Sequence, residues 1–346
     1  MPAERSSMAE LAEEILRGED AWVVGGAVRD ELLGRPVLDL DIACREPERA
    51  ARAYGARSGG AVFPLSVHHG GWRVALDDGR TVDFLPLQGG SIEADLGTRD
   101  FAINAIAVPL AGGEALDPYH GRTDLERGVV RVVSPRVFDD DPLRLFRAVR
   151  MEDELGFRLD RKAEALVRER APLVTQPAGE RVLDELRRIS ADGYERLAGL
   201  GLLEPLGGSL SPRLRDFDSP EYRLAVTFGA RLRRLPISNE LRRFTDTLLR
   251  AQAPADGSPR AIHRFRRATE PWALEALAYL DAGERADAVR AARQHEPAQP
   301  LLRGDELGVP EGPEVGRLLE LVAEERAAGT ISTREEALDL VRESMG

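Results

Sequence analysis

Cysteine, lysine and long apolar runs are all scarce in this sequence of 346 residues. The single cysteine, Cys44, has no partner for an internal disulfide, which favours a reducing compartment and predicts a cytoplasmic protein. No apolar run approaches the roughly 20 residues that span a bilayer, and the first residues are acidic where a secretory signal would be basic and apolar. We therefore expect no membrane partner, and the five scattered histidines do not indicate a zinc site.

The charge balance gives two opposing indications. The net charge of −12 argues against nucleic acid, because phosphate binding needs basic side chains. The 48 basic residues include only one lysine, Lys162, and two stretches are locally basic, Arg231–Arg243 and Arg260–Arg267. Arginine binds phosphate through two parallel hydrogen bonds, so these stretches are candidates for RNA binding, although the base composition of a genome gives the same bias toward arginine.

The spacing of apolar residues changes near residue 120. Before this point, short apolar or alternating runs predict strands between short helices, whereas after it a spacing of about 3.6 residues predicts helices alone. The predicted strands lie at 21–24, 38–43 and within 61–87, where His69-Gly70-Gly71 breaks the pattern, and the segment 101–109 fits either a strand or a helix. The predicted helices lie at 8–18, 27–34, 47–58, 140–157, 160–170, 178–191, 193–203, 221–234 and 237–251.

This pattern predicts an α+β protein in three parts. An α/β head over residues 1–120 comes first, a helical neck over 121–195 follows it, and a helical body and tail over 196–346 complete the chain. Stretches rich in proline and glycine at 204–213 and 253–259 are typical of linkers between helices.

Two aspartates, Asp39 and Asp41, lie two residues apart in the strand predicted at 38–43. Residues two apart in a strand point to the same face, so both carboxylates converge while Leu38, Leu40 and Ile42 are expected to face the core. Two like charges side by side repel unless a cation neutralises them, and hard oxygen ligands favour Mg²⁺. An isolated pair of this kind is more often a solvated strand face, so further signals are needed.

Two such signals are present. A third carboxylate, Asp83, lies on a predicted strand that could run alongside, and paired metal ions could then activate a 3′-hydroxyl and stabilise a leaving pyrophosphate. Gly25-Gly26 ends one strand and opens a helix, which lets backbone N–H groups approach a phosphate. Placed one short helix before the two aspartates, this loop is predicted to hold a triphosphate facing a metal site.

Five motifs follow one another within residues 20–190: GGAVRD, LDLDIA, TRDFAINAIA, DPYHGRTDLERGVVRVV and DDPLRLFRAVRMEDELGF. In this order they resemble the class II tRNA nucleotidyltransferase and bacterial poly(A) polymerase family. The resemblance implies that CMP and AMP are added from CTP and ATP to the 3′ end of tRNA without a template, with Mg²⁺ as cofactor. A poly(A) polymerase, an enzyme that adds only C-C, and a non-catalytic RNA-binding relative are the alternatives, and the intact aspartates count against the last.

The resemblance also assigns roles to individual residues. It implies that Asp39 and Asp41 bind metal and, with Asp83, form the catalytic group. The residues that it implies for nucleotide binding are Gly25, Gly26, Arg29, Arg99, Asp100, Asn104, Asp141, Arg144, Arg147 and Arg181. Three positions depart from the family pattern, because Thr98 stands for an arginine, Asp140 for a glutamate and His120 for a glycine.

The pair Asp141 and Arg144 resembles the family's nucleotide-selecting motif. If 140–157 is one helix, the two side chains are neighbours on one face. A carboxylate accepts from the amino group of cytosine or adenine and a guanidinium donates to the ring nitrogen, whereas uracil and guanine present the opposite polarity. The same sequence is also typical of a charged helix N-terminus.

The segment 84–98 is short for this family, in which the corresponding region holds a flexible loop. Its shortness resembles members that add only C. Two alternatives follow: the enzyme adds C-C and stops, or another segment resets the pocket from C to A.

Overall fold

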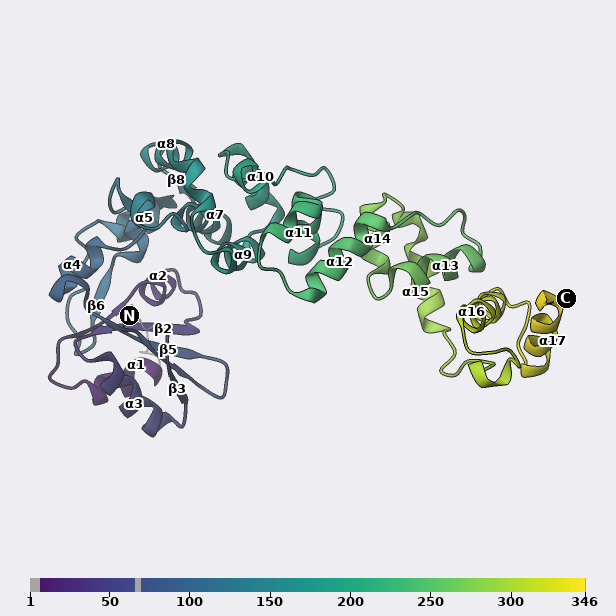
Figure 1. The fold of residues 1–346 in the computed structure, drawn as a ribbon. Helices are drawn as coiled ribbons and strands as arrows, with labels where there is room; N and C mark the ends of the chain where they lie inside the picture. Colours follow the sequence, from purple (N-terminus) through teal and green to yellow (C-terminus); the bar gives the residue numbers. More distant parts are fainter. Residues whose placement is uncertain (1–6, 66–69, 346) are drawn as a thin grey trace. The chain divides into compact units, whose positions relative to one another are not determined.

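The computed structural model describes residues 7–65 and 70–345 (Figure 1). His68 and His69, where the strand pattern is predicted to break, lie outside the described residues. The chain forms two compact units, Met1–Leu206 and Gly207–Gly346. The finer division at residues 120 and 195 stays a prediction.

The first unit contains a six-stranded sheet in the order β3-β4-β5-β2-β1-β6. Strand β2 runs parallel to β5, and the other neighbouring strands are antiparallel. The strands are β1 (Ala21–Val24), β2 (Asp39–Cys44), β3 (Ala61–Pro64), β4 (Trp72–Ala75), β5 (Thr81–Pro86) and β6 (Ala107–Pro109). All strands predicted before residue 90 are confirmed.

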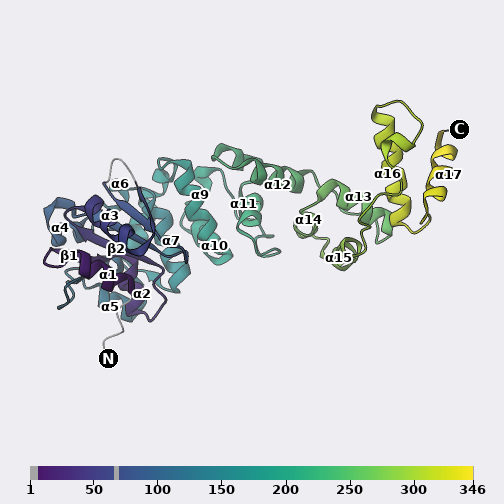
Figure 2. The same cartoon turned by 90° about the horizontal axis from the view of Figure 1, so that it is seen from below.

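One face of the sheet is covered by α3 (Pro47–Ser58), and α1 (Ser7–Ile15) packs on α3 (Figures 1 and 2). The rings of Tyr54 on α3 and Phe84 on β5 lie 5.6 Å apart between centroids. The strand residues Leu40 and Ile42 are buried, as predicted. The prediction for Leu38 is wrong: β2 begins one residue later, and this side chain is 63% exposed.

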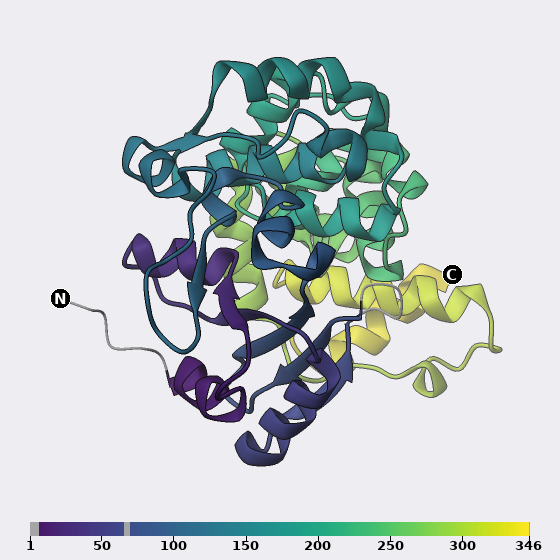
Figure 3. The same cartoon turned by 90° about the vertical axis from the view of Figure 1, so that its left-hand side faces the viewer.

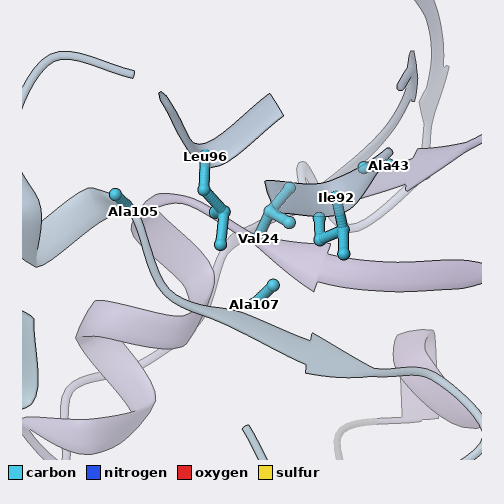
Figure 4. Close-up of a cluster of buried hydrophobic side chains, with 6 residues drawn as sticks. All are labelled: Val24, Ala43, Ile92, Leu96, Ala105 and Ala107. Atoms are coloured by element: carbon cyan, nitrogen blue, oxygen red, sulfur yellow. The ribbon is translucent and has the colours of Figure 1, made fainter. Parts of the chain in front are cut away.

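The opposite face packs against α4 (Ile92–Gly97) through a small apolar core shown in Figure 4. Its buried members are Val24, Ala43, Ile92, Leu96, Ala105 and Ala107. Ser91 caps α4 by accepting a hydrogen bond from the Ala94 N–H at 3.3 Å. Most of segment 84–98 is therefore ordered structure anchored in the core. The ambiguous segment 101–109 contains both a 3₁₀ turn, η2 (Ala102–Asn104), and strand β6.

The rest of the first unit is helical apart from a two-stranded ribbon, and its teal helices lie to one side of the sheet in Figure 3. Its elements are α2 (Gly26–Leu32), α5 (Gly121–Arg127), β7 (Val129–Val130), α6 (Val137–Asp140), α7 (Arg144–Leu155), β8 (Arg158–Leu159), α8 (Arg161–Arg170), α9 (Gly179–Arg188) and α10 (Ala191–Gly199). Helix α5 follows His120, whose φ of 57° lies in the left-handed region that favours the glycine of the family pattern.

The single helix predicted over 140–157 is wrong at its beginning. Helix α6 ends at Asp140, Asp141 is extended with φ −147° and ψ 100°, and α7 begins at Arg144. The physical cause is Pro142, because a proline disfavours the helical conformation of the residue before it.

The second unit is built of helices throughout the part of it that the structure describes, as predicted. They are α11 (Pro220–Phe228), α12 (Asn239–Arg250), α13 (Pro259–Thr269), α14 (Ala273–Tyr279), α15 (Ala286–Gln294), α16 (Pro313–Ala327) and α17 (Arg334–Met345). The helix predicted over 221–234 ends instead at Phe228, because Gly229, with φ 51°, turns the chain into the 3₁₀ segment η5 (Gly229–Arg234). Among the described residues, none of the helices is both long and apolar enough to span a bilayer.

Candidate active site

The sheet register brings the three predicted carboxylates onto one face. Strand β2 pairs Asp41 with Asp83 on β5, and β5 pairs Asp83 with Arg73 on β4. Asp39 lies two residues before Asp41 and is opposite Thr81. Residues in register point to the same side of a sheet, so the aspartates form one carboxylate group at its edge. The prediction that Asp83 lies alongside Asp39 and Asp41 is confirmed.

Negative charge is crowded at this group. Burial, together with the nearby Asp83 and Asp39, raises the pKa of Asp41 to about 6, against the lowering effect of Arg99 and Arg73. Thr81 Oγ1 donates to Asp39 Oδ1 at 2.6 Å. A half-buried carboxylate with two carboxylate neighbours is stabilised by a cation, which the arginines supply only in part.

The donor set fits a hard divalent cation held by two carboxylates. Within residues 7–65 and 70–345, no three His, Cys, Asp or Glu side chains are grouped closely enough to hold a metal ion. Asp83 is engaged elsewhere, because its two oxygens accept from Nε and Nη2 of Arg73 at 2.7 Å each. Asp39 and Asp41 remain available, and Mg²⁺ typically binds one or two carboxylates and keeps several waters.

Gly25 approaches this group closely. A Cβ at Gly25, whose φ is 73°, would lie 2.9 Å from both Arg99 Nη1 and Asp41 Oδ2, so a side chain does not fit. Arg99 is held by the buried Asp95, which accepts from its Nε at 3.1 Å and its Nη2 at 2.9 Å. Nη1 of Arg99 is thereby presented beside Gly25, where the sequence predicts the triphosphate.

A second polar network supports the other predicted nucleotide contacts. Arg29 Nη1 donates to Asn104 Oδ1 at 2.8 Å, and Asn104 Nδ2 donates to Asp100 Oδ1 at 2.9 Å. Arg147 Nε donates to Asp100 Oδ2 at 2.8 Å. Burial alone would raise the pKa of Asp100, but the Arg147 charge and these hydrogen bonds outweigh it and lower the pKa to about 2. Asp100 is therefore ionised and fixes Arg147.

The network continues to a residue that the sequence did not single out. Buried Glu185 on α9 accepts from Arg150 Nε at 2.7 Å and lies 3.7 Å from Arg147 Nη1. Helix α9 is thus tied to α7 through charge pairs with two arginines that line the cavity. Glu185 follows Arg181 by four residues, a helical spacing that could have drawn attention to it.

The predicted partnership of Asp141 with Arg144 on one helix face is not found. Asp141 Oδ2 accepts from Arg181 Nη2 at 2.9 Å, while Arg144 Nη2 donates to the Thr98 carbonyl at 2.7 Å. Because the helix is broken at Pro142, Asp141 lies outside both helices and Arg144 begins α7, so the two side chains do not share a helix face. They nevertheless line the same cavity.

One cavity of about 840 Å³ in the first unit collects all the predicted site residues. They are Gly25, Gly26, Arg29, Asp39, Asp41, Asp83, Arg99, Asp100, Asn104, Asp141, Arg144, Arg147 and Arg181. Arg73, Arg150 and Arg188 line it as well and were not predicted. This placement brings the residues together, and their individual roles stay predictions.

A strand-borne carboxylate pair, a glycine loop and a ring of arginines around one cavity define the catalytic domain of a nucleotidyltransferase. Residues 21–78 and 73–131 match the model of the poly(A) polymerase head domain. The chain is 34% identical to a CC-adding tRNA nucleotidyltransferase of Geobacter sulfurreducens, covering 92% of this chain and 91% of that protein. It is 32% identical to an A-adding tRNA nucleotidyltransferase of Deinococcus radiodurans, covering 93% and 95%. The chain belongs to the tRNA nucleotidyltransferase family.

Solved structures show the same fold. The Thermotoga maritima CCA-adding enzyme complexed with tRNA aligns with a TM-score of 0.75 at 22% identity, covering 98% of this chain and 94% of that one. A CCA-adding enzyme in complex with CTP aligns with a TM-score of 0.80 at 22% identity, with the same coverage. The predicted α+β class is confirmed.

Proposed function

We propose that this enzyme adds CMP and AMP from CTP and ATP to the 3′ end of tRNA, without a template, in the cytoplasm and with Mg²⁺. The observation that carries the proposal is the single cavity in which the carboxylate group, the Gly25 loop and the Asp141 and Arg144 side chains meet. The head at 1–120 would provide the chemistry, the neck at 121–195 the nucleotide selection, and residues 196–346 the tRNA contacts.

The reaction joins the tRNA 3′-oxygen to the α-phosphorus of the nucleotide. The bond from that phosphorus to the bridging oxygen breaks, pyrophosphate leaves with the electron pair, and the 3′-hydroxyl proton is released. Asp39 and Asp41 would hold Mg²⁺, which supplies charge stabilisation and lowers the pKa of the hydroxyl. Arg99, fixed by Asp95, binds the triphosphate beside Gly25 and so orients the leaving group.

The direct test is incubation of the protein with tRNAs that end in no C, one C or two Cs, with each of the four nucleoside triphosphates separately. Incorporation of C on the first two substrates is expected. Incorporation of none of the four would refute the proposal, and long tracts of A would point to a poly(A) polymerase.

A narrower function, addition of C-C without A, is favoured by the packing of segment 84–98. Ile92 and Leu96 are 5% and 0% exposed, and Asp95 accepts from the Gln88 N–H at 3.2 Å as well as holding Arg99. Resetting the pocket by moving this segment would expose that core. A tRNA lacking all three terminal residues, given CTP and ATP together, is then extended by two. If the tRNA is extended by three nucleotides, with the last added as fast as the two Cs, the enzyme is not limited to adding C-C.

We predict that Asp141→Ala or Arg144→Ala blurs nucleotide choice more than it slows the reaction. Loss of one base-edge hydrogen bond should reduce the preference for CTP over UTP by about tenfold or more. The measurement is kcat/KM for CTP, ATP, UTP and GTP. Asp140→Ala is the matched control, because this neighbour is exposed on α6 and does not line the cavity. If Asp141→Ala does not change the preference for CTP over UTP, the role of Asp141 is limited to its ion pair with Arg181.

The two basic stretches predicted to hold tRNA differ in their surroundings. On α13, Arg260 pairs with Glu325 at 2.6 Å, Arg264 with Glu324 at 2.5 Å and Arg267 with Glu320 at 2.9 Å, all on α16. These arginines are already neutralised. On α12, Arg242 and Arg243 are exposed and form no ion pair with any described residue.

We therefore expect α12 rather than α13 to bind the phosphates of tRNA. Replacing Arg242 and Arg243 together by glutamine should weaken tRNA binding and lower its salt slope by up to about two, since each phosphate contact contributes about 0.9 in a duplex. Replacing Arg264 and Arg267 is the matched control and should change the slope by less than about half as much. Equal effects of the two pairs in a salt titration of tRNA affinity would contradict this assignment.

A further inference from the structure

Arg73 lies at the end of the carboxylate row opposite the glycine loop. The register across β4, β5, β2 and β1 runs from Arg73 through Asp83 and Asp41 to Val24, and Gly25 follows directly. Neighbouring strands are about 4.8 Å apart, so roughly 14 Å separates the two ends of the row. Arg73 and Gly25 therefore flank the carboxylates from opposite sides.

The guanidinium of Arg73 is held in one orientation. Asp83 binds its Nε and Nη2 through two hydrogen bonds of 2.7 Å, with the side chains of Arg73 and Asp83 35% and 10% exposed. No described residue accepts a hydrogen bond from Nη1, and Arg73 lines the cavity. A planar group fixed along one edge, with donors left on the other, is suited to binding a phosphate oxygen.

The direction of the reaction decides which phosphate this is. In phosphoryl transfer the attacking and leaving oxygens lie roughly in line on opposite sides of the phosphorus. The leaving pyrophosphate belongs at the Gly25 and Arg99 end of the row, so the attacking 3′-hydroxyl approaches from the Arg73 end. The nearest anion on that side is the phosphodiester on the 5′ side of the terminal tRNA nucleotide.

We propose that Arg73, oriented by Asp83, binds the last phosphodiester of the tRNA acceptor end and so positions the attacking hydroxyl. Asp83 then serves as a positioning residue for Arg73 rather than as a third metal ligand. The inference rests on the proposed function and adds to it a contact for the RNA end.

The test pairs a change in the protein with a change in the RNA. Affinity is measured by fluorescence anisotropy in EDTA for tRNA ending in one C, with the terminal linkage either natural or replaced by an uncharged methylphosphonate. The neutral linkage should weaken binding to the wild-type protein about tenfold, the loss expected for a charged hydrogen bond. Arg73→Gln should weaken binding of natural tRNA similarly. When the variant and the neutral linkage are combined, the affinity should fall by no more than about twofold below that of either change alone.

Arg80→Gln is the matched control, because Arg80 pairs with Asp78 at the neighbouring hairpin turn and does not line the cavity. It should leave the tenfold effect of the linkage intact. If Arg73→Gln fails to fold, Arg73→Lys is used instead, since lysine keeps the positive charge but lacks the two-pronged guanidinium. Its loss of tRNA affinity should be smaller than that of Arg73→Gln. This loss, too, should not add to the loss caused by the neutral linkage.

The inference is overturned if the affinity losses caused by Arg73→Gln and by the neutral linkage multiply when the two changes are combined. It is also overturned if Arg73→Gln leaves the affinity for natural tRNA unchanged. With Mg²⁺ and CTP, Arg73→Gln should raise KM for tRNA about tenfold while KM for CTP stays within about twofold. If the wild-type protein extends natural tRNA but the losses caused by Arg73→Gln and by the neutral linkage multiply, only the role of Arg73 is contradicted. A wild-type protein that extends no tRNA contradicts the proposed function itself.

Discussion

Asp41→Asn should abolish nucleotide incorporation, lowering the turnover of CTP by about a thousandfold or more. The substitution removes one of the two carboxylates proposed to hold the metal ion, and the charge stabilisation that would be lost amounts to several kcal/mol of the barrier. Asp39→Asn should act in the same way. Single-turnover incorporation of C into tRNA measures the effect.

The loss should not come from unfolding. Asp41 is crowded by Asp83 and Asp39, so replacing its carboxylate by an amide relieves repulsion. The melting temperature in EDTA is expected to stay equal or rise. Asp77→Asn, at an exposed hairpin turn, is the control and should keep full activity. Near-normal turnover of the Asp41 variant with Mg²⁺ would exclude Asp41 as a metal ligand.

Asp100→Ala should be the most destabilising single change in the site. It leaves the Arg147 guanidinium partly buried and without its closest carboxylate, which costs about 3 kcal/mol of unfolding free energy when a buried pair is broken. Urea unfolding followed by tryptophan fluorescence gives the value. Asp139→Ala breaks an exposed pair with Arg170 and should cost less than about 1 kcal/mol.

The pH dependence of this stability has a defined sign. The folded pKa of Asp100 is about 2, below its ordinary value of 3.8, so its contribution is complete above pH 3.8 and is lost as the pH falls toward 2. The difference between wild type and Asp100→Ala should therefore be constant from pH 5 to 7 and shrink below pH 4. A difference that is unchanged at pH 3 would show that the pKa of Asp100 is not lowered in the folded protein.

The parts of the site that depend on local pattern could be predicted from the sequence. Alternation placed Asp39 and Asp41 on one face of β2, and the glycine pair marked the turn after β1. Local pattern also contained missed signals. Asp95 precedes Arg99 by four residues, the spacing of a helical ion pair, and the structure shows that pair. Pro142 alone would have placed the helix break at Asp141 correctly, because a proline disfavours the helical conformation of the residue before it.

Contacts between distant segments could not be predicted in this way. Arg73 is an ordinary strand residue until the register of β4 and β5 places it opposite Asp83. The arginines of α13 look like an RNA-binding stretch until α16, more than fifty residues further along, supplies the glutamates that neutralise them. Charge in sequence is a property of one segment, whereas charge at a surface depends on what packs beside it.

Because Gly25 has no side chain, two groups of the site, the guanidinium of Arg99 and the carboxylate of Asp41, both lie close to its Cα. Arg99 and Asp41 both reach into the space that a Cβ would fill. Any substitution at Gly25 is therefore expected to displace both the arginine proposed to bind the triphosphate and the aspartate proposed to hold the metal. A later compensating change at Arg99 alone or at Asp41 alone would restore only one of the two positions, so we expect this glycine to be harder to exchange in evolution than a residue that touches one of them.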